Sequence, residues 1–526
     1  MITTTLSEAL QALNAPQFKG ALAGIKRGIE REALRINHNG RLAQTGHPEG
    51  AGHALTHPHI TTDYSESLLE FITPVSENAE ETLAQLSDLQ KFTLAQMQGE
   101  RLWPMSMPCF IESQDDIALA QFGSSNIGRM KTLYRQGLKS RYGSMMQAIA
   151  GVHFNMSFSD KLWQALYQLD NQQGELQSFI SERYLGLIRN FKRELWLISY
   201  LFGASPALCH SFLQGRQTNL PFKHLGKGTL YLEQGTALRL GNLGYTNSAQ
   251  SSLRVTYNSL CDYVKGLQTA IRSPSDIYAD IPDYRASQPL QLNSNILQIE
   301  NEFYSPIRPK RNTKKGETPT QALARGGIEY IEVRALDVNP FTATGISLEQ
   351  IYFLDVFLTY CLLKASPEMS WDAQQWSQSN LQKVVNEGRD PQLMLTRCGG
   401  QPVAMRDWAT QIFVDLTIVA EALDAAYGST VYGETIATMA KWVAQPELTY
   451  SGRLVAKLVT EQSDSGTLAL RLAEQYALQH HNDDYKVYNE QGLKEWAQQS
   501  FAKAKEIEAS DTVSFTEFLT EYFAKA

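Results

Sequence analysis

The sequence predicts an α+β fold in which a mixed body is followed by a helical region. Between about residues 20 and 340, short segments of alternating apolar and polar residues are mixed with helical segments and with Gly and Pro turns. From about residue 345 onward, apolar residues recur at three- and four-residue spacing, which is typical of helices. We therefore expect a body over residues 1–345 and a helical region over 346–526 that packs on it.

The composition is that of a large globular protein. The chain has 526 residues, of which 43% are hydrophobic and 19% are charged, and this excludes disordered and low-complexity classes. The length suits either three or four domains of about 150 residues or one large body with insertions. The formal net charge of −8 gives no reason to expect nucleic acid or an anionic membrane as a partner.

Neither a signal peptide nor a membrane span is expected. The N-terminus has the pattern of a short amphipathic helix around Leu6, Leu10 and Leu13. The apolar stretch 195–204 is too short for a bilayer and the stretch 351–363 contains an aspartate, so both predict buried helices. Five cysteines without a CxxC spacing suit free thiols in the cytoplasm, with a disulfide between one pair as the alternative.

The helical region divides into segments at Gly and Pro turn signals. The clearest helical periodicities lie at 404–427, 431–444, 454–460 and 492–507.

Five segments of the body predict strands with one apolar and one reactive polar face, because residues i and i+2 of a strand share a side. In the first segment Gly28 stands beside the polar residues and leaves space for a ligand. The polar faces carry, in chain order, Glu30 and Glu32 (25–35); Asp63 and Glu70 (61–71); His153, Asn155 and Ser157 (151–158); Gln298, Glu300, Glu302 and Tyr304 (297–304); and Tyr330, Glu332 and Arg334 (328–337).

A solvated sheet face is the simplest explanation of polar residues on any single strand. Strands, however, disfavour Glu, and several carboxylates on one face repel one another unless cations lie among them. Mg²⁺ and Mn²⁺ prefer carboxylate oxygens, whereas a structural zinc site needs more Cys or His than this single histidine. We therefore predict a divalent-metal site, with the solvated face as the alternative.

Motifs for nucleotide binding and hydrolysis are missing from the sequence: it contains no P-loop, GxGxxG, HExxH or GxSxG pattern. The Gly-rich stretch 123–129 is predicted to be a plain loop. A basic segment, 308–316, is predicted to be a loop in which Arg308 and Lys310 could bind phosphates, or else a solvated surface loop.

Sequence blocks over about residues 20–345 resemble bacterial glutamate–cysteine ligases (γ-glutamylcysteine synthetases) of the proteobacterial type. The helical region matches this family more loosely. The matching blocks are 28–32, 61–63 with 68–74, 103–109, 131–135, 151–155, 201–206, 243–247, 298–311 and 325–334.

The resemblance implies a fold related to glutamine synthetase, with a curved antiparallel sheet that forms a funnel wrapped by helices. It implies an ATP-dependent ligase that joins the γ-carboxylate of L-glutamate to the amine of L-cysteine through a γ-glutamyl phosphate, the first step of glutathione synthesis. It further implies a cytoplasmic monomer that is inhibited by glutathione, with no nucleic-acid or membrane partner.

The resemblance also implies roles for individual residues. Arg334 would stabilise the transferring phosphoryl group, and Arg239 would hold the α-carboxylate of glutamate, with a structural ion pair as its alternative. The metal ligands, for Mg²⁺ or Mn²⁺, would be Glu30, Glu32, Asp63, Glu70, His153 and Glu332. The cysteine pocket would be Tyr64, Tyr134, Leu138, Gln147, Tyr245 and Tyr304, unless these are ordinary core residues. The ATP contacts would be Asn155, Arg308 and Lys310.

Other functions remain open at this point. A related ligase could use another amine, and a divalent-metal hydrolase without ATP would share the carboxylate cluster. A catalytically inactive binding protein with this fold would tolerate loss of the carboxylates.

Overall fold

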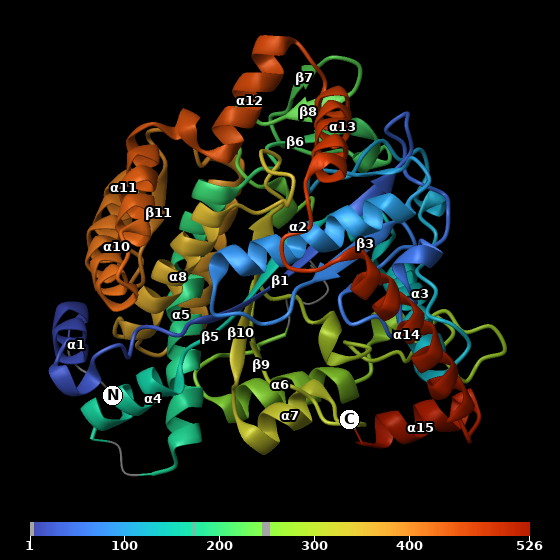
Figure 1. Ribbon diagram of the computed structural model, residues 1–526, viewed down its shortest axis with the longest axis horizontal. Helices are drawn as coiled ribbons and strands as arrows, with labels where there is room; N and C mark the ends of the chain where they lie inside the picture. Colours follow the sequence, from blue (N-terminus) through green and yellow to red (C-terminus); the bar gives the residue numbers. More distant parts are fainter. Residues whose placement is uncertain (1–4, 172–173, 245–252, 526) are drawn as a thin grey trace.

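The computed structural model describes residues 5–171, 174–244 and 253–525, and it is built around one antiparallel sheet (Figure 1). The strands follow the order β2-β3-β1-β5-β10-β9, and β4 pairs with β1 beside this path. The sheet strands are β1 (Lys26–Ile36), β2 (Ile60–Thr62), β3 (Leu68–Ile72), β4 (Arg101–Leu102), β5 (Gly151–Ser157), β9 (Ile307–Lys310) and β10 (Tyr330–Asp337). The predicted α+β class is confirmed.

Two small sheets and the helices surround this centre. The small sheets pair β6 (Ala207–Cys209), β8 (Thr229–Tyr231) and β7 (Lys223–Leu225), and β11 (Met394–Thr396) with β12 (Pro402–Ala404). The helices are α1 (Leu6–Leu13), α2 (Ala79–Gln96), α3 (Asn126–Tyr142), α4 (Asp160–Leu169), α5 (Leu176–Phe202), α6 (Leu260–Arg272), α7 (Pro319–Gly326), α8 (Leu348–Leu363), α9 (Trp371–Glu387), α10 (Met405–Tyr427), α11 (Val431–Ala444), α12 (Tyr450–Glu461), α13 (Ser465–Asn482), α14 (Glu490–Ala509) and α15 (Phe515–Lys525).

Helices cover one face of the sheet. Helix α2 packs on β1 and β3, α5 packs on β9 and β10, and α8 packs against both α2 and α5 (Figure 1). The apolar residues of β5 (Val152, Phe154 and Met156) lie in the core with those of β10. The polar residues of the same strands therefore project from the opposite face, as the alternation predicts.

The predicted buried helix at 351–363 is confirmed as α8. Its aspartate, Asp355, is fully buried, and its carboxylate accepts hydrogen bonds from the Arg27 guanidinium of β1. A charge in an apolar helix is thus explained by a buried partner on the neighbouring strand.

The predicted strand at 297–304 is wrong. This segment contains a 3-10 turn, Glu300–Glu302, whose two glutamates are buried. Glu302 pairs with Arg141 at 3.0 Å, and Glu300 accepts a hydrogen bond from the Thr320 hydroxyl at 2.7 Å. Their carboxylates satisfy Arg141 and the Thr320 hydroxyl instead of joining the polar face of the sheet.

Three other segments differ in detail from the predictions. The segment 61–71 is two strands, β2 and β3, that pair with each other, and Asp63 lies where β2 ends. Arg308 and Lys310 lie in edge strand β9, so the predicted basic loop begins only after them. The Gly-rich stretch is a loop up to Ser125, which caps helix α3.

The C-terminal part is helical, as predicted, apart from the hairpin of β11 and β12. Helices α10 and α11 lie side by side and pack on α8, whereas α14 and α15 run back along the N-terminal part (Figure 1). Apolar residues from both sides of residue 345 share one core cluster. None of the helices in the described part of the chain is long and apolar enough to cross a membrane.

Candidate active site

The register of the sheet brings the predicted metal ligands together. Glu30 of β1 stands opposite His153 of β5, and Glu32 stands opposite Glu70 of β3. Glu332 of β10 lies one strand further along, opposite Asn155. Directly opposed side chains of an antiparallel pair are neighbours, so four strands build one polar cluster.

Two groups of potential ligands share one imidazole. In each group, one ligand atom per residue lies within 4.8 Å of the others. The first group is Glu30, His153 and Glu332, and the second is Glu32, Glu70 and His153. The Nδ1 of His153 lies 3.0 Å from a carboxylate oxygen of Glu30, and its Nε2 lies 3.5 Å from one of Glu32.

The pKa values of the carboxylates in this cluster shift in different directions, because their electrostatic surroundings differ. Burial, followed by the charges of Glu30 and Asp63, raises the pKa of Glu70 well above its ordinary value. Burial likewise raises the pKa of Glu32. Burial opposes ionisation of Glu332 too, but the charges of Lys310 and Arg334 hold the pKa of this carboxyl below its ordinary value. Their nitrogens lie 3.5 and 3.3 Å from Glu332 Oε1.

The residues of the cluster fit a hard divalent cation. The second oxygen of Glu332 and the side-chain oxygen of Asn155 are buried and accept no hydrogen bond from the described residues. Carboxylate oxygens with one imidazole are the donor set that Mg²⁺ and Mn²⁺ accept. A cation here would also stabilise the ionised forms of Glu32 and Glu70, which burial disfavours.

Asp63 lies at the edge of the cluster. It belongs to neither group of three, although its charge raises the pKa values of both Glu32 and Glu70. Its backbone carbonyl accepts a hydrogen bond from the Arg135 guanidinium of helix α3.

Arg239 and Arg334 form a cationic pair beside the carboxylates. Arg239 is buried, and its Nη2 donates to the backbone oxygen of Arg334 at 2.9 Å. Its Nε and Nη1 have no hydrogen-bond partner among the described residues. A Cβ at Gly151 would lie 2.1 Å from this guanidinium, so a side chain there would displace it. Arg239 thus has donors available for an anionic ligand.

The residues predicted for a substrate pocket come from separate segments of the chain. Tyr64 is buried beside the end of β2, and its hydroxyl lies 2.8 Å from that of Ser144. Tyr134 and Leu138 lie one turn apart on α3, while Gln147 is buried shortly after it. Burial raises the pKa of the Tyr304 hydroxyl, and the nearby charges of Arg239 and Arg334 oppose this shift. Tyr245 lies outside the described residues.

Two cations of α3 were missed by sequence reasoning. Lys131 and Arg135 are one turn apart on the same helix as Tyr134, and both interact with the charges of Asp63 and Glu70. Burial, followed by the charge of Arg135, lowers the pKa of Lys131 to about 8. Their i, i+4 spacing beside Tyr134 is a signal that could have indicated them.

Strand β9 borders a separate cavity of about 260 Å³. Arg308 and Lys310 line it together with Tyr330, Tyr263 and Glu300. Asn155, in contrast, lies within the carboxylate cluster, where its amide nitrogen donates to Glu30 at 2.9 Å. Lys310 therefore connects the cavity to the cluster through Glu332.

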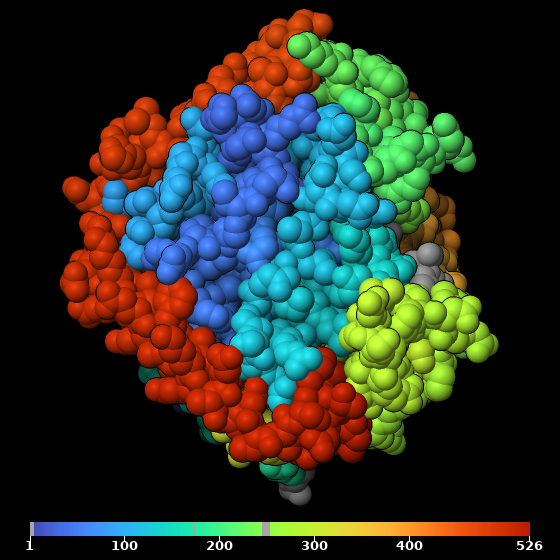
Figure 2. Space-filling model, turned by 90° about the vertical axis from the view of Figure 1, so that its right-hand side faces the viewer, coloured from blue at the N-terminus to red at the C-terminus, as the bar shows by residue number. Residues whose placement is uncertain are grey.

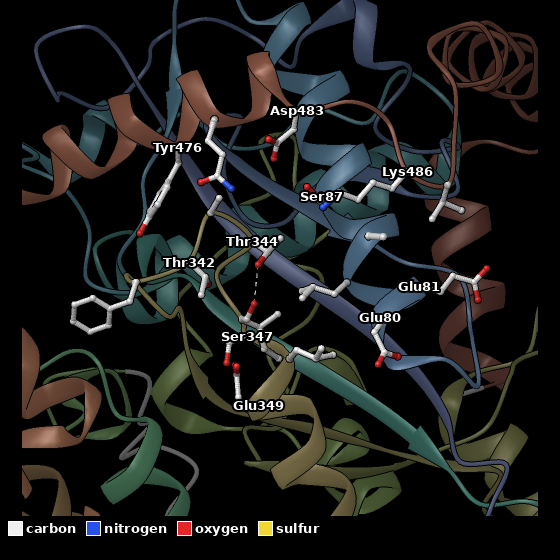
Figure 3. Close-up of a pocket in the computed structure, with 18 of the residues that line it drawn as sticks. Glu80, Glu81, Ser87, Thr342, Thr344, Ser347, Glu349, Tyr476, Asp483 and Lys486 are labelled. Atoms are coloured by element: carbon white, nitrogen blue, oxygen red, sulfur yellow. Dashed lines mark hydrogen bonds between the residues drawn. The ribbon is translucent and has the colours of Figure 1, made fainter. Parts of the chain in front are cut away.

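A groove of about 1090 Å³ lies elsewhere, between α2, the loop 341–349 and α13 (Figure 3). Figure 3 shows Glu80 and Ser87 of α2 on one side and Tyr476 of α13 on the other. Among the described residues, none of those predicted for the site lines this groove. Helix α2 covers the face of the sheet opposite the carboxylates, so the groove does not belong to the cluster.

The fold and the cluster together define an enzyme class in which one face of a helix-backed antiparallel sheet gathers carboxylates for cations and arginines for anions. The family model for glutamate-cysteine ligase matches residues 10–384 of the chain. The chain is 64% identical to the glutamate--cysteine ligase of Pseudoalteromonas translucida and 50% identical to that of Vibrio campbellii. These alignments cover 99% and 95% of this chain, and the same shares of the two relatives. The chain belongs to the glutamate–cysteine ligase family.

Solved structures share this fold. The glutamate--cysteine ligase of Francisella tularensis in complex with AMP superimposes with a TM-score of 0.88 at 34% identity, covering 95% of this chain and 98% of that one. The bifunctional glutathione synthetase of Pasteurella multocida shares the fold with a TM-score of 0.72 at 24% identity, covering 91% of this chain and 55% of that one.

Proposed function

We propose that this protein joins the γ-carboxylate of L-glutamate to the amine of L-cysteine at the expense of ATP. The observation that carries the proposal is the position of the two ligand groups that share His153. Lys310, which borders the cavity at β9, lies 3.5 Å from Glu332 of one group, and Arg239, which has donors available, acts through its charge on Glu32 of the other. One side suits a nucleotide and the other suits an amino-acid carboxylate.

The proposed reaction has two steps. First, an oxygen of the glutamate γ-carboxylate attacks the γ-phosphorus of ATP, and ADP leaves. The cysteine amine then attacks the carbonyl carbon of the resulting γ-glutamyl phosphate, loses a proton and expels phosphate. Phosphoryl transfer depends mainly on positioning and charge stabilisation, so the residues need to hold reactants rather than react themselves.

Each part of the site has a role in these steps. Arg239 would bind the glutamate α-carboxylate, and Arg334 would stabilise the charge on the phosphoryl group and on the tetrahedral intermediate. Arg308 and Lys310 would contact the nucleotide from β9, with Asn155 nearby in the cluster. Tyr64, Tyr134, Leu138, Gln147 and Tyr304, with Tyr245, would surround the cysteine.

The cation ligands would be Glu30, Glu32, Glu70, His153 and Glu332, with Asp63 at the edge. We propose Mg²⁺ as the resident ion, with Mn²⁺ as an alternative, because the donors are mainly hard oxygens. A bound ion would offset the charge of the ATP phosphates and of the attacking carboxylate.

Three further properties belong to the same proposal. Glutathione repeats the γ-glutamylcysteine unit and would inhibit by occupying the substrate pocket. The chain would act as a monomer. The five free cysteines suit a reducing compartment, which favours the cytoplasm.

A coupled assay tests this function. Purified protein with ATP, glutamate, cysteine and Mg²⁺ should release phosphate and yield γ-glutamylcysteine by mass spectrometry. Omitting either amino acid or adding EDTA should stop both. Cleavage of an amide or phosphate ester without ATP would instead support the hydrolase. Ligand binding without turnover, left unchanged by Glu332→Gln, would support the catalytically inactive binding protein. Replacing cysteine by 2-aminobutyrate and comparing kcat/KM tests the identity of the amine.

A further inference from the structure

The C-terminal segment 508–525 packs against the helix that carries part of the proposed substrate pocket. Figure 2 shows the C-terminal helices in red running along the edge of the blue-to-cyan N-terminal part. They end beside the yellow-green segment around residue 300. Helix α15 contacts α3 there, so the chain end lies close to residues from the first half of the sequence.

A second hydrophobic cluster, separate from the main core, joins α15 to α3. Leu519 of α15 is fully buried in it, together with Met130 and Leu133 of α3 and Leu292. The aromatic residues Phe515, Phe518, Tyr522 and Phe523 of α15 pack around this centre. Leu519 is the buried residue of α15, so it anchors this helix in the cluster.

Polar contacts attach the same segment to the N-terminus of α3. The Asp511 carboxylate accepts a hydrogen bond from the backbone N–H of Asn126 at 2.6 Å, and the Asn126 side chain donates to the Val513 carbonyl at 3.0 Å. The Arg129 guanidinium lies 4.1 Å from the centre of the Phe515 ring. The first N–H groups of a helix lack partners within the helix and attract anions, so Asp511 stabilises the start of α3.

Helix α3 also reaches the carboxylate cluster, because the charges of Asp63 and Glu70 act on its Lys131 and Arg135. Tyr134 contacts both the second cluster and the main core, and Leu138 lies in the main core. Arg135, on the next position, donates to the Asp63 carbonyl. One side of α3 therefore faces the proposed amine pocket, while the adjacent side is held by α15.

We propose that segment 508–525 is a positioning element for the amine substrate. By fixing α3, it sets the distance between Tyr134 and Leu138 on one side and the carboxylate cluster on the other. The inference rests on the proposed ligase function. Residues 508–525 are not catalytic, because they act through α3.

Leu519→Ala tests the proposal in the full-length protein. The KM for cysteine should rise about five- to tenfold, whereas the KM for ATP stays within about twofold, because only the α3 side of the site loosens. Hydrogen exchange should accelerate in residues 126–142 and stay unchanged in β5. Leu519→Met, which conserves volume, should restore both values. Glu521→Ala on the exposed side of α15 is the matched control and should behave as the wild type.

Asp511→Asn keeps the test valid if Leu519→Ala does not fold. It removes only an exposed charge and should raise the KM for cysteine in the same direction. The proposal is overturned if both variants leave the KM for cysteine and the hydrogen exchange of α3 unchanged. It is also overturned if the KM values for cysteine, glutamate and ATP all rise equally. If the wild type shows no cysteine-dependent ATP turnover, the proposed function fails, and the exchange of α3 still decides whether α15 holds it.

Discussion

Arg27 and Asp355 form an ion pair that is closed to solvent, with 2.5 Å between Nη2 and Oδ2 and with side chains 1% and 0% exposed. Arg27 precedes Gly28 on β1 and points to the face opposite Glu30. The pair therefore ties the strand that carries Glu30 and Glu32 to helix α8 behind it. Its effect on the site is indirect, through the position of β1.

Asp355→Ala should lower the free energy of unfolding by about 3–5 kcal/mol, because it leaves Arg27 buried without its carboxylate. Urea denaturation followed by circular dichroism measures the change. Glu490→Ala, which removes an exposed pair with Lys494, is the control and should leave the midpoint nearly unchanged. Similar midpoints for the two variants would show that the buried pair contributes little.

The face of β1 that Arg27 occupies shows what alternation could and could not predict. The period of two correctly placed Glu30, Glu32, His153 and Glu332 on one face, because strand geometry alone decides which residues share a side. It said nothing of the charged residues on the helix-facing side. Arg27, for example, is buried there, and its partner lies 328 residues away in the chain.

Polar alternation also occurs outside strands, as Glu302 shows. Alternation alone gave Glu302 and Glu332 equal standing, since both lie in segments that alternate, and only the family resemblance assigned Glu332 to the metal ligands. The structure separates them: Glu332 joins the ligand cluster, whereas Glu302 neutralises Arg141 and accepts a hydrogen bond from Tyr142. A buried long-range partner such as Arg141 leaves no local pattern, so spacing could not distinguish the two.

Paired substitutions test this separation. Glu332→Gln should reduce kcat at least about 100-fold while the melting temperature stays close to that of the wild type, because charge at the reacting centre is lost. Glu302→Gln should instead reduce stability by about 2–4 kcal/mol, since it weakens a buried ion pair. Steady-state kinetics and urea denaturation on both proteins measure the contrast. A stability loss in Glu332→Gln with normal kcat would assign that residue a structural role.

Removal of divalent cations should destabilise the protein more strongly at high pH. Burial and neighbouring carboxylates raise the pKa of Glu70 well above the ordinary value of 4.5. A group whose pKa is raised on folding contributes stability that is complete below its unfolded pKa and is lost as pH rises through the folded pKa. The melting temperature in EDTA should therefore fall as the pH increases from 4.5 through the raised pKa of Glu70 in the folded protein. Added Mg²⁺ should reverse most of this loss.

Glu70→Gln is the matched variant for this measurement. It should melt higher than the wild type in EDTA at high pH, because one repelling charge is gone, and it should bind Mg²⁺ about 10–100-fold more weakly. Titration calorimetry with Mg²⁺ alone measures the affinity. If EDTA changes the melting temperature equally at every pH, repulsion within the cluster is not what the cation relieves.

Arg239→Lys should raise the KM for glutamate about 10–100-fold and leave the KM for ATP within about twofold, because lysine keeps the charge but loses the planar set of donors. The available Nε and Nη1 of Arg239, beside the backbone of Arg334, are the basis for this expectation. Gly151→Ala should have the same effect, since its Cβ would displace the guanidinium. Arg216→Lys, at an exposed position, is the control for the substitution itself. An unchanged glutamate KM in both Arg239→Lys and Gly151→Ala would favour the structural ion pair as the role of Arg239.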